Sequence, residues 1–145
     1  MNKIISYSTV FFQFLFIALI IHDGGWLAKN SLWLLVEISG IMIGLWAIFA
    51  MQIGNFNITP DVKQSGKFVE KGPYGYIRHP MYTSVLLTTF GLAADQPSAY
   101  RLVLWGLLLI TLLIKLTHEE KLLSQHFPEY RDYRDRTRRL VPYLF

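Results

Sequence analysis

The chain has 145 residues, of which 52% are hydrophobic and 17% are charged, and its formal net charge is +4. This length suits one domain, residues 1–145, and soluble domains usually carry about 25% charged residues. Because the apolar residues are also gathered into blocks, we expect a membrane protein. The absence of cysteine excludes disulfides, thiolate catalysis and cysteine-based zinc sites, and we expect no metal site.

Two long apolar runs come first in the chain. Residues 4–21 carry no charge, and no small-residue cleavage site follows them, so we expect a retained anchor rather than a signal peptide. Residues 32–51 are long enough, at about 1.5 Å per residue, to cross a hydrocarbon core of about 30 Å. We therefore expect residues 1–51 to form a two-helix anchor, and residues 52–145 to carry the chemistry.

The second run contains two features that lipid alone does not explain. Glu37 is its single charge, and a carboxylate inside a membrane is a functional candidate by default. Its place near the outer leaflet favours a structural role, either protonated or hydrogen-bonded to a neighbouring helix, with Gln13 as a candidate partner. Gly40 and Gly44 form a GxxxG pattern, which predicts close helix packing within the chain and also allows an oligomer.

Two shorter apolar runs, residues 81–94 and 102–117, are separated by "ADQPSAYR". At this length each run suits a re-entrant or partly embedded helix as well as a full span. The separating stretch predicts a tight turn, so the two runs should form a helical hairpin. We thus expect an all-α integral membrane protein with two spanning helices, a shorter membrane hairpin and a cytoplasmic amphipathic C-terminal helix.

Positive charge is divided unevenly between the two sides of this arrangement. Every Lys and Arg except Lys29 and Arg101 falls on the side of the termini and of the 52–80 loop. The positive-inside rule places that side, with the candidate site, in the cytoplasm, and we expect a prokaryotic cytoplasmic membrane. Since the basic residues flank membrane segments, we do not expect nucleic-acid binding.

The stretch "KGPYGYIRHPMY" precedes the third run and concentrates polar and aromatic residues. Pro80 suits the first turn of a helix, whose free N–H groups make an anion site. Arg78 and His79 come directly before it. The surrounding rings are those of Tyr74, Tyr76 and Tyr82. The alternative is that these residues only anchor the chain at the membrane interface.

The far end of the predicted hairpin carries "THEE". A hairpin brings its two ends together, so Glu119 and Glu120 are predicted to face Arg78, His79 and the tyrosines. Neighbouring helical positions differ by about 100° in direction, so the two carboxylates should have different roles. One would meet a ligand while the other holds Arg78, His79 or the tail. The alternative is a solvated acidic helix exit.

The C-terminal tail reads "FPEYRDYRDRTRRLVPYLF". Pro128 and Glu129 predict a helix start. Four positions then recur at helical spacing, Tyr130, Tyr133, Thr137 and Leu140, and arginines occupy the remaining surface. This pattern indicates either a basic amphipathic helix on anionic lipid or a lid over a cytoplasmic pocket, and the two are compatible.

"GPYGYIRHPMY", followed later by "EEKLL" and "HFPEYRDYRDR", resembles the isoprenylcysteine carboxyl methyltransferases and the related phospholipid methyltransferases. The resemblance covers residues 66–142 and rests on Arg-His-Pro, a hydrophobic hairpin and Glu-Glu. It implies an integral membrane enzyme that uses S-adenosylmethionine without a Rossmann-like domain. The sequence agrees, because it contains no GxGxxG after a strand.

The resemblance also implies roles for individual residues. Arg78, His79 and Glu120 would be the catalytic or supporting residues. Lys115 stands where enzymes acting on prenylated proteins carry a substrate-binding arginine; lysine keeps the charge and loses bidentate recognition of a carboxylate. The implied cofactor-binding residues are Gly66, Lys67, Phe68, Val69, Tyr74, His79, Pro80, Met81, Tyr82 and Glu119.

The implied acceptor is a membrane lipid or a prenylated small molecule. An amine or hydroxyl acceptor would need a general base, for which His79, His118 and Glu120 are candidates, whereas a carboxylate would not. Two other functions remain open from the sequence. One is a membrane reductase using NADPH on an isoprenoid or sterol double bond, and the other is a non-catalytic membrane adaptor with the same fold.

Overall fold

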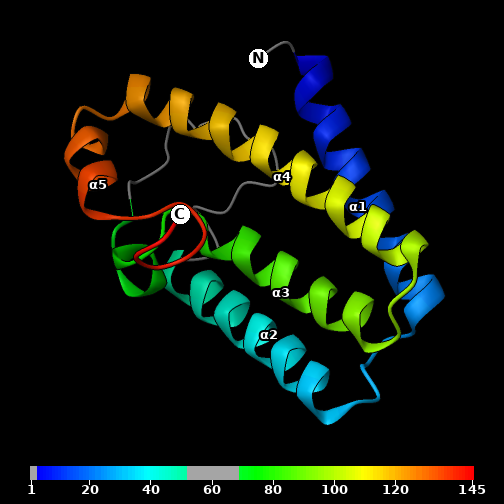
Figure 1. Cartoon of the computed structure of the whole chain (residues 1–145). Helices are drawn as coiled ribbons and strands as arrows, with labels where there is room; N and C mark the ends of the chain where they lie inside the picture. The colour runs from blue at the N-terminus through cyan, green and yellow to red at the C-terminus, as the bar shows by residue number, and fades with distance from the viewer. Residues whose placement is uncertain (1–2, 52–68) are drawn as a thin grey trace.

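The computed structural model describes residues 3–51 and 69–145, and the side chains from residue 6 onward within them. All regular elements in these ranges are helices: α1 (Lys3–Gly24), α2 (Ser31–Met51), the 3₁₀ helix η2 (Gly72–Gly75), α3 (Pro80–Asp95), α4 (Ala99–His126) and α5 (Tyr130–Arg136). Figure 1 shows α1 to α4 as an up-and-down bundle. The predicted all-helical membrane fold is confirmed.

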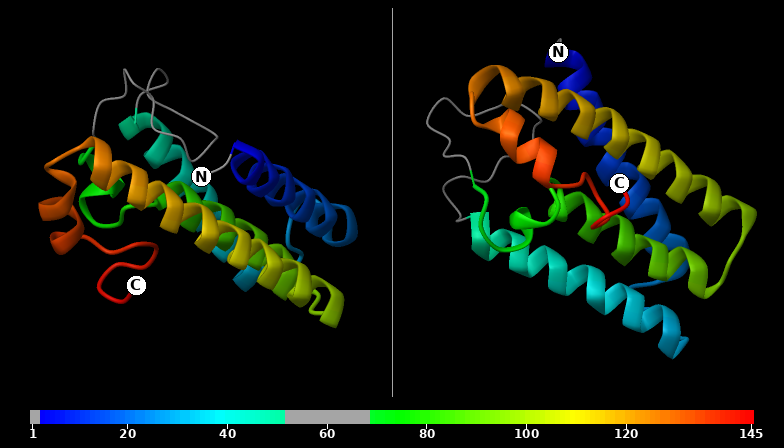
Figure 2. Two further views of the ribbon diagram at one scale, coloured as in Figure 1. Left: turned by 90° about the horizontal axis from the view of Figure 1, so that it is seen from above. Right: turned by 60° about the vertical axis from the view of Figure 1, so that its left-hand side comes forward.

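The bundle has two ends, which differ in character. At the tail end, α2 finishes, α3 begins and α4 leads into α5 and the C-terminal tail (Figure 1). At the turn end, α1 connects to α2 and α3 connects to α4. Figure 2 shows α2 beside α3, and α1 beside α4. All predicted site residues that the structure describes lie toward the tail end.

Local signals in the sequence set the helix boundaries. Gly25 follows α1 with a positive φ of 84°, and its N–H bonds the Ile21 carbonyl at 2.8 Å, as expected for a glycine helix stop. Asn30 and Ser98 cap α2 and α4 with their side-chain oxygens. Pro80 occupies the first turn of α3, as predicted.

Three helices, α1, α2 and α4, are long and apolar enough to cross a membrane. Their outward side chains are strongly exposed, for example Phe11 at 63%, Leu35 at 68% and Val103 at 61%, which suits contact with lipid rather than water. The sequence left open whether the fourth segment spans the membrane; α4 has 28 residues, continues past Thr117 to His126 and is long and apolar enough to do so. With 16 residues, α3 stays short.

The turn end is fastened by carboxylates. Arg101 donates from Nε to Asp23 at 2.6 Å, and the Asp95 carboxylate accepts from the backbone N–H groups of Lys29 and Asn30 at 3.0 and 2.7 Å. Glu37 is 2% exposed and accepts from the Ala28 N–H at 3.0 Å. Glu37 is therefore hydrogen-bonded to the loop between α1 and α2, which agrees with the structural role predicted for it.

Gln13 is not the partner of Glu37, as the sequence had suggested. Its Oε1 instead accepts a hydrogen bond of 2.7 Å from Lys115 Nζ. Because α1 packs against α4, Gln13 in the middle of α1 meets α4 rather than α2.

Gly40 and Gly44 allow α2 to approach α3 within one chain. A Cβ at Gly40 would lie 2.7 Å from the backbone nitrogen of Thr88, and a Cβ at Gly44 would meet Ser84 Oγ. This contact satisfies the GxxxG pattern inside the chain. The oligomer that the same pattern allows stays a prediction.

Gly40→Ala is expected to lower stability by roughly 1–3 kcal/mol, because the added methyl group collides with backbone that cannot move aside. Gly106→Ala on α4 is the matched control, since a Cβ there meets nothing within 4 Å. Thermal unfolding in detergent should show a lower midpoint for Gly40→Ala alone. Equal midpoints for the two variants would contradict the α2–α3 contact.

Candidate active site

The segment before α3 is a compact turn. Gly72 has a positive φ of 63°, and the N–H groups of Tyr76 and Ile77 both bond the Pro73 carbonyl at 3.1 Å. Pro73 and Tyr74 are buried in η2. The "GPYG" stretch therefore forms the turn predicted from its glycines and proline, and it presents Arg78 and His79 at the start of α3.

The C-terminal tail lies along this segment. Arg78 N–H and His79 N–H donate to the carbonyls of Arg138 and Arg139 at 2.7 and 3.0 Å. An isolated parallel β-bridge pairs Ile77 with Arg138. The tail therefore takes up both backbone N–H groups directly before Pro80. The tail covers the α3 start in the manner of a lid.

The predicted C-terminal helix is shorter than its pattern suggested. It begins at Tyr130 rather than Pro128 and ends at Arg136. Tyr130, Tyr133, Thr137 and Leu140 are nevertheless all buried, at 5% exposure or less. The helical spacing identified the buried residues correctly, although Thr137 and Leu140 reach the core from extended or turn backbone.

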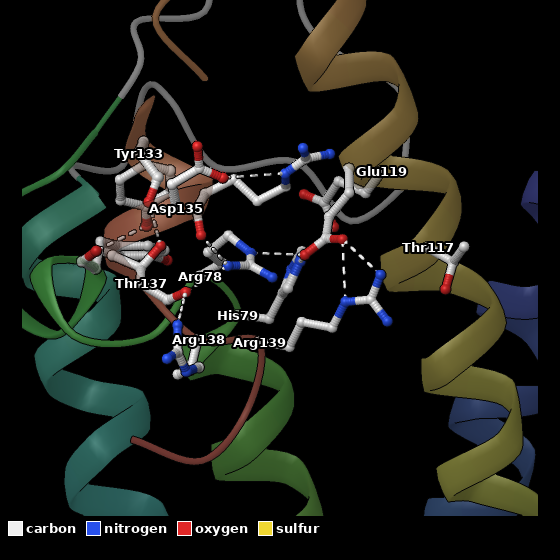
Figure 3. A network of polar contacts seen from close by, with 12 residues as sticks. Arg78, His79, Thr117, Glu119, Tyr133, Asp135, Thr137, Arg138 and Arg139 are labelled. Atoms are coloured by element: carbon white, nitrogen blue, oxygen red, sulfur yellow. Dashed lines mark hydrogen bonds and ion pairs between the residues drawn. The ribbon is translucent and has the colours of Figure 1, made fainter. Parts of the chain in front are cut away.

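Glu120 is the centre of a buried ionic cluster, to which Arg78 and Arg139, labelled in Figure 3, belong. Arg78 Nε donates to Glu120 Oε1 at 2.7 Å, and Arg139 donates to Oε2 from Nε at 3.1 Å and from Nη2 at 3.0 Å. Arg78 Nη1 also donates to the carbonyls of Arg134 and Thr137 at 3.0 and 2.6 Å. Both side chains of the Arg78–Glu120 pair are 8% exposed. This cluster ties α3, α4 and the tail together.

Glu119 has a different environment, as predicted for neighbouring helix positions. Its side chain is 31% exposed, and its Oε2 accepts from the Tyr82 hydroxyl at 2.8 Å and lies 3.7 Å from His79 Nδ1. The His79 and Tyr82 rings are stacked, with their centroids 5.3 Å apart and an angle of 2° between their planes. His79 Nε2, which makes no hydrogen bond within the described part of the chain, lies 3.4 Å from Glu120 Oε1.

Lys115 lies one helical turn before Glu119 on α4 and is 2% exposed. Its Nζ donates to Gln13 and lies 5.3 Å from the centre of the Tyr82 ring, a cation–π arrangement. Tyr82 therefore contacts Lys115 through its ring and Glu119 through its hydroxyl. This row of three side chains leads from the apolar interior to the tail end.

Buried tyrosines brace the region. The Tyr133 hydroxyl donates to the Tyr74 carbonyl at 2.7 Å, and the Tyr74 hydroxyl lies 3.7 Å from Met51 Sδ. Burial raises the pKa of the Tyr74 phenol well above its ordinary value, and the Glu119 carboxylate adds to this. Burial likewise raises the pKa of Tyr133. Both phenols therefore stay protonated and act as donors.

The remaining predicted site residues are placed as follows. Gly66, Lys67 and Phe68 lie outside the described residues. Pro80 is buried and Met81 half-buried in the first turn of α3. Val69 precedes η2 and is half-buried.

The sequence model of the phospholipid methyltransferase family matches residues 32–130, which is well over half of the chain. The chain belongs to the phospholipid methyltransferase family. The matched range covers α2 from Leu32, α3, α4 and both ends of the hairpin, and so contains every predicted site residue; Gln13 and the site contacts from the tail beyond residue 130 lie outside it.

A nickel-cobalt-cadmium resistance protein, NccN, of Alcaligenes xylosoxydans xylosoxydans is 36% identical to this chain over 85 residues. The aligned stretch is 57% of this chain and 39% of that protein, so it spans well under half of the relative's length. No solved structure gives a significant match. In residues 3–51 and 69–145, no three His, Asp or Glu side chains gather as a metal site.

Sequence reasoning missed two members of the site region. Arg139 was not singled out from the other basic residues of the tail, although it shares Glu120 with Arg78. Gln13 was assigned to Glu37 rather than Lys115. The run "RTRRL" contains Arg138 and Arg139 side by side. Arg139 points inward and Arg138 is exposed, and only the path of the tail in the fold distinguishes them.

Proposed function

We propose that this chain is an S-adenosylmethionine-dependent methyltransferase that acts on a lipid-like acceptor reaching the site from the bilayer. One observation carries the proposal: Glu119 on α4 meets Tyr82 and His79 at the start of α3. Glu119 lies 37 residues after Tyr82 and 40 residues after His79 in the chain. The stretch with His79 and Tyr82 and the stretch with Glu119 are the two halves of the pattern that resembles the family's cofactor site.

The residues present suit the cofactor's chemistry. Glu119 is the partly exposed carboxylate, and it can accept charge-assisted hydrogen bonds from an ammonium group. The stacked rings of His79 and Tyr82 offer flat surface to an aromatic base or a cation. When bound, S-adenosylmethionine would supply a methyl group on a positively charged sulfur.

The site geometry narrows the roles of Arg78 and Glu120. Glu120 accepts from two guanidinium groups, so it is a poor proton acceptor, and Arg78 is engaged at Nε and Nη1. We infer that both are positioning residues, which fix His79 and the tail. His79 is then the better candidate for a general base with an amine or hydroxyl acceptor, because its ring stacks on Tyr82 and lies beside the partly exposed Glu119.

The environment of Lys115 favours a methyl acceptor that carries an anionic group. Its ammonium group lies in the apolar bundle, and in the described part of the chain it donates a hydrogen bond to a neutral amide, that of Gln13. A phosphate or carboxylate entering beside α1 and α4 would balance this charge. Tyr82 would then separate the acceptor group from Glu119 by the width of one ring.

We further propose that the tail end faces the cytoplasm. Only two of the 14 Lys and Arg residues, Lys29 and Arg101, belong to the turn end, and the positive-inside rule counts these residues.

Glu119→Gln is expected to weaken binding of S-adenosylhomocysteine roughly ten- to hundredfold, because a hydrogen bond to a charged group contributes about 1.5–3 kcal/mol. Calorimetry on the purified full chain in detergent measures it. Glu129→Gln is the matched control, since Glu129 is exposed and its side chain caps nothing. Wild-type protein that binds no S-adenosylhomocysteine at millimolar concentration would refute the methyltransferase and favour an adaptor.

A further inference from the structure

The tail and α5 form a hollow that the proposed methyl-transfer site does not use. It has a volume of about 460 Å³ and is open to solvent. Its lining residues are Arg78, Arg134, Asp135, Thr137, Arg138, Arg139, Leu144 and Phe145. His79, Tyr82 and Glu119 do not line it. Figure 3 shows Thr137, Arg138 and Arg139 following one another along the tail.

The hollow has an excess of positive charge. Four guanidinium groups and one carboxylate line it. Glu120, behind the wall, balances part of the charge of Arg78 and Arg139. Arg134 approaches Asp135 only at 3.9 Å, with both side chains more than half exposed, so water screens this pair.

Arg134 and Arg138 are the guanidinium groups best placed for a ligand. Arg138 is exposed, and its described side-chain contact is a long hydrogen bond of 3.5 Å to the carbonyl of Thr137. Guanidinium groups bind phosphate oxygens in pairs of hydrogen bonds. The hollow therefore suits a phosphate ester.

An apolar wall stands beside these cations. Leu144 is 82% exposed and Phe145 is 47% exposed. The tail holds them there by a closed turn, in which the N–H groups of Leu140 and Val141 both donate to the Phe145 carbonyl at 2.7 Å. Large exposed apolar residues next to arginines suit a ligand with a phosphate and a hydrocarbon part better than inorganic phosphate.

The position of the tail fits the membrane surface. Thr83 donates from Oγ1 to the Leu140 carbonyl at 2.7 Å, which places the tail beside the first turn of α3, where the chain enters the apolar bundle. We propose that the hollow binds one anionic phospholipid from the surrounding leaflet. Arg134 and Arg138 contact its phosphate, and Leu144 and Phe145 contact the start of an acyl chain. The hollow shares Arg78 and Arg139 with the Glu120 cluster, and the proposed lipid contacts use Arg134 and Arg138 instead.

The test is native mass spectrometry of the delipidated full chain in detergent, titrated with phosphatidylglycerol or phosphatidylcholine. Phosphatidylglycerol should bind more tightly than phosphatidylcholine. The double variant Arg134→Gln/Arg138→Gln should weaken the binding of phosphatidylglycerol roughly thirtyfold, because each basic residue near an anionic lipid contributes about fivefold in affinity. Arg131→Gln is the matched control, an exposed arginine of α5 outside the hollow, and should change little.

Leu144→Ser separates the lipid from a free anion. This substitution should weaken the binding of phosphatidylglycerol and leave any binding of glycerol phosphate unchanged. Equal binding of the two lipids, wild-type affinity in the double arginine variant, or an equal loss in Arg131→Gln would each overturn the site. Glycerol phosphate binding as tightly as phosphatidylglycerol would overturn the lipid assignment. Unfolding midpoints near wild type confirm that each variant is folded.

Discussion

Glu120→Gln is expected to destabilise the tail end of the bundle by roughly 3–5 kcal/mol, because it leaves buried cations without their counter-charge. The substitution keeps the shape of the side chain and removes only the charge. Arg78 is 8% exposed and cannot turn to water, while its backbone N–H is fixed to the tail. The tail should therefore detach from the start of α3 before the membrane helices separate.

Limited proteolysis in detergent measures this detachment. Cleavage after the arginines of residues 131–139 should be much faster in Glu120→Gln than in wild type. Glu119→Gln is the matched control, since its partly exposed carboxylate holds a tyrosine and no guanidinium group. Similar cleavage of the tail in both variants would show that the ionic cluster does not fasten it.

The two neighbouring carboxylates should thus separate cleanly in two assays. Glu120→Gln should lower tail protection, and Glu119→Gln should lower S-adenosylhomocysteine affinity with the tail intact. Because adjacent residues on one helix differ by about 100°, this division was predictable in kind from the sequence. The assignment of Glu119 to the cofactor came from the family resemblance, and the contact of Glu120 with Arg139 was not predicted, because it depends on the path of the tail.

Hydropathy predicted the membrane helices well and their ends less well. α1 and α2 match the two apolar runs to within a few residues. α4 exceeds its run because helical structure continues after apolar composition stops, with Glu120 buried on its inner face beyond the end of the run. A hydropathy pattern marks where a helix leaves lipid, and it does not mark where the helix ends.

Long-range pairings were the weakest part of the sequence prediction. Lys115 and Gln13 are 102 residues apart, and Glu37 was an equally reasonable partner for Gln13 by charge and depth. The choice depends on which helices are neighbours, and the small residues of α2 settle that by drawing α3, not α1, against Gly40 and Gly44. Local motifs predicted composition of the site but not this arrangement.

Lys115→Met is expected to reduce methyl transfer to membrane lipid roughly ten- to hundredfold with little loss of stability. The loss of activity follows from removing a charged hydrogen-bond donor to the proposed anionic acceptor, which contributes about 1.5–3 kcal/mol. Stability should change by under about 2 kcal/mol, because leaving Gln13 unpaired is offset by removing a buried charge. Labelled S-adenosylmethionine with a total lipid extract gives the rate.

Lys121→Met is the matched control, because Lys121 is an exposed cation on the same helix. It should transfer methyl groups at the wild-type rate. Lys115→Arg should keep more activity than Lys115→Met, since it keeps the charge. If Lys115→Met binds S-adenosylhomocysteine and methylates lipid like wild type, Lys115 only fills space between α1 and α4, and the acceptor needs no anionic group. A parallel loss of cofactor binding would instead place Lys115 with Tyr82 and Glu119 on the cofactor side, since its Nζ lies 5.3 Å from the Tyr82 ring centre.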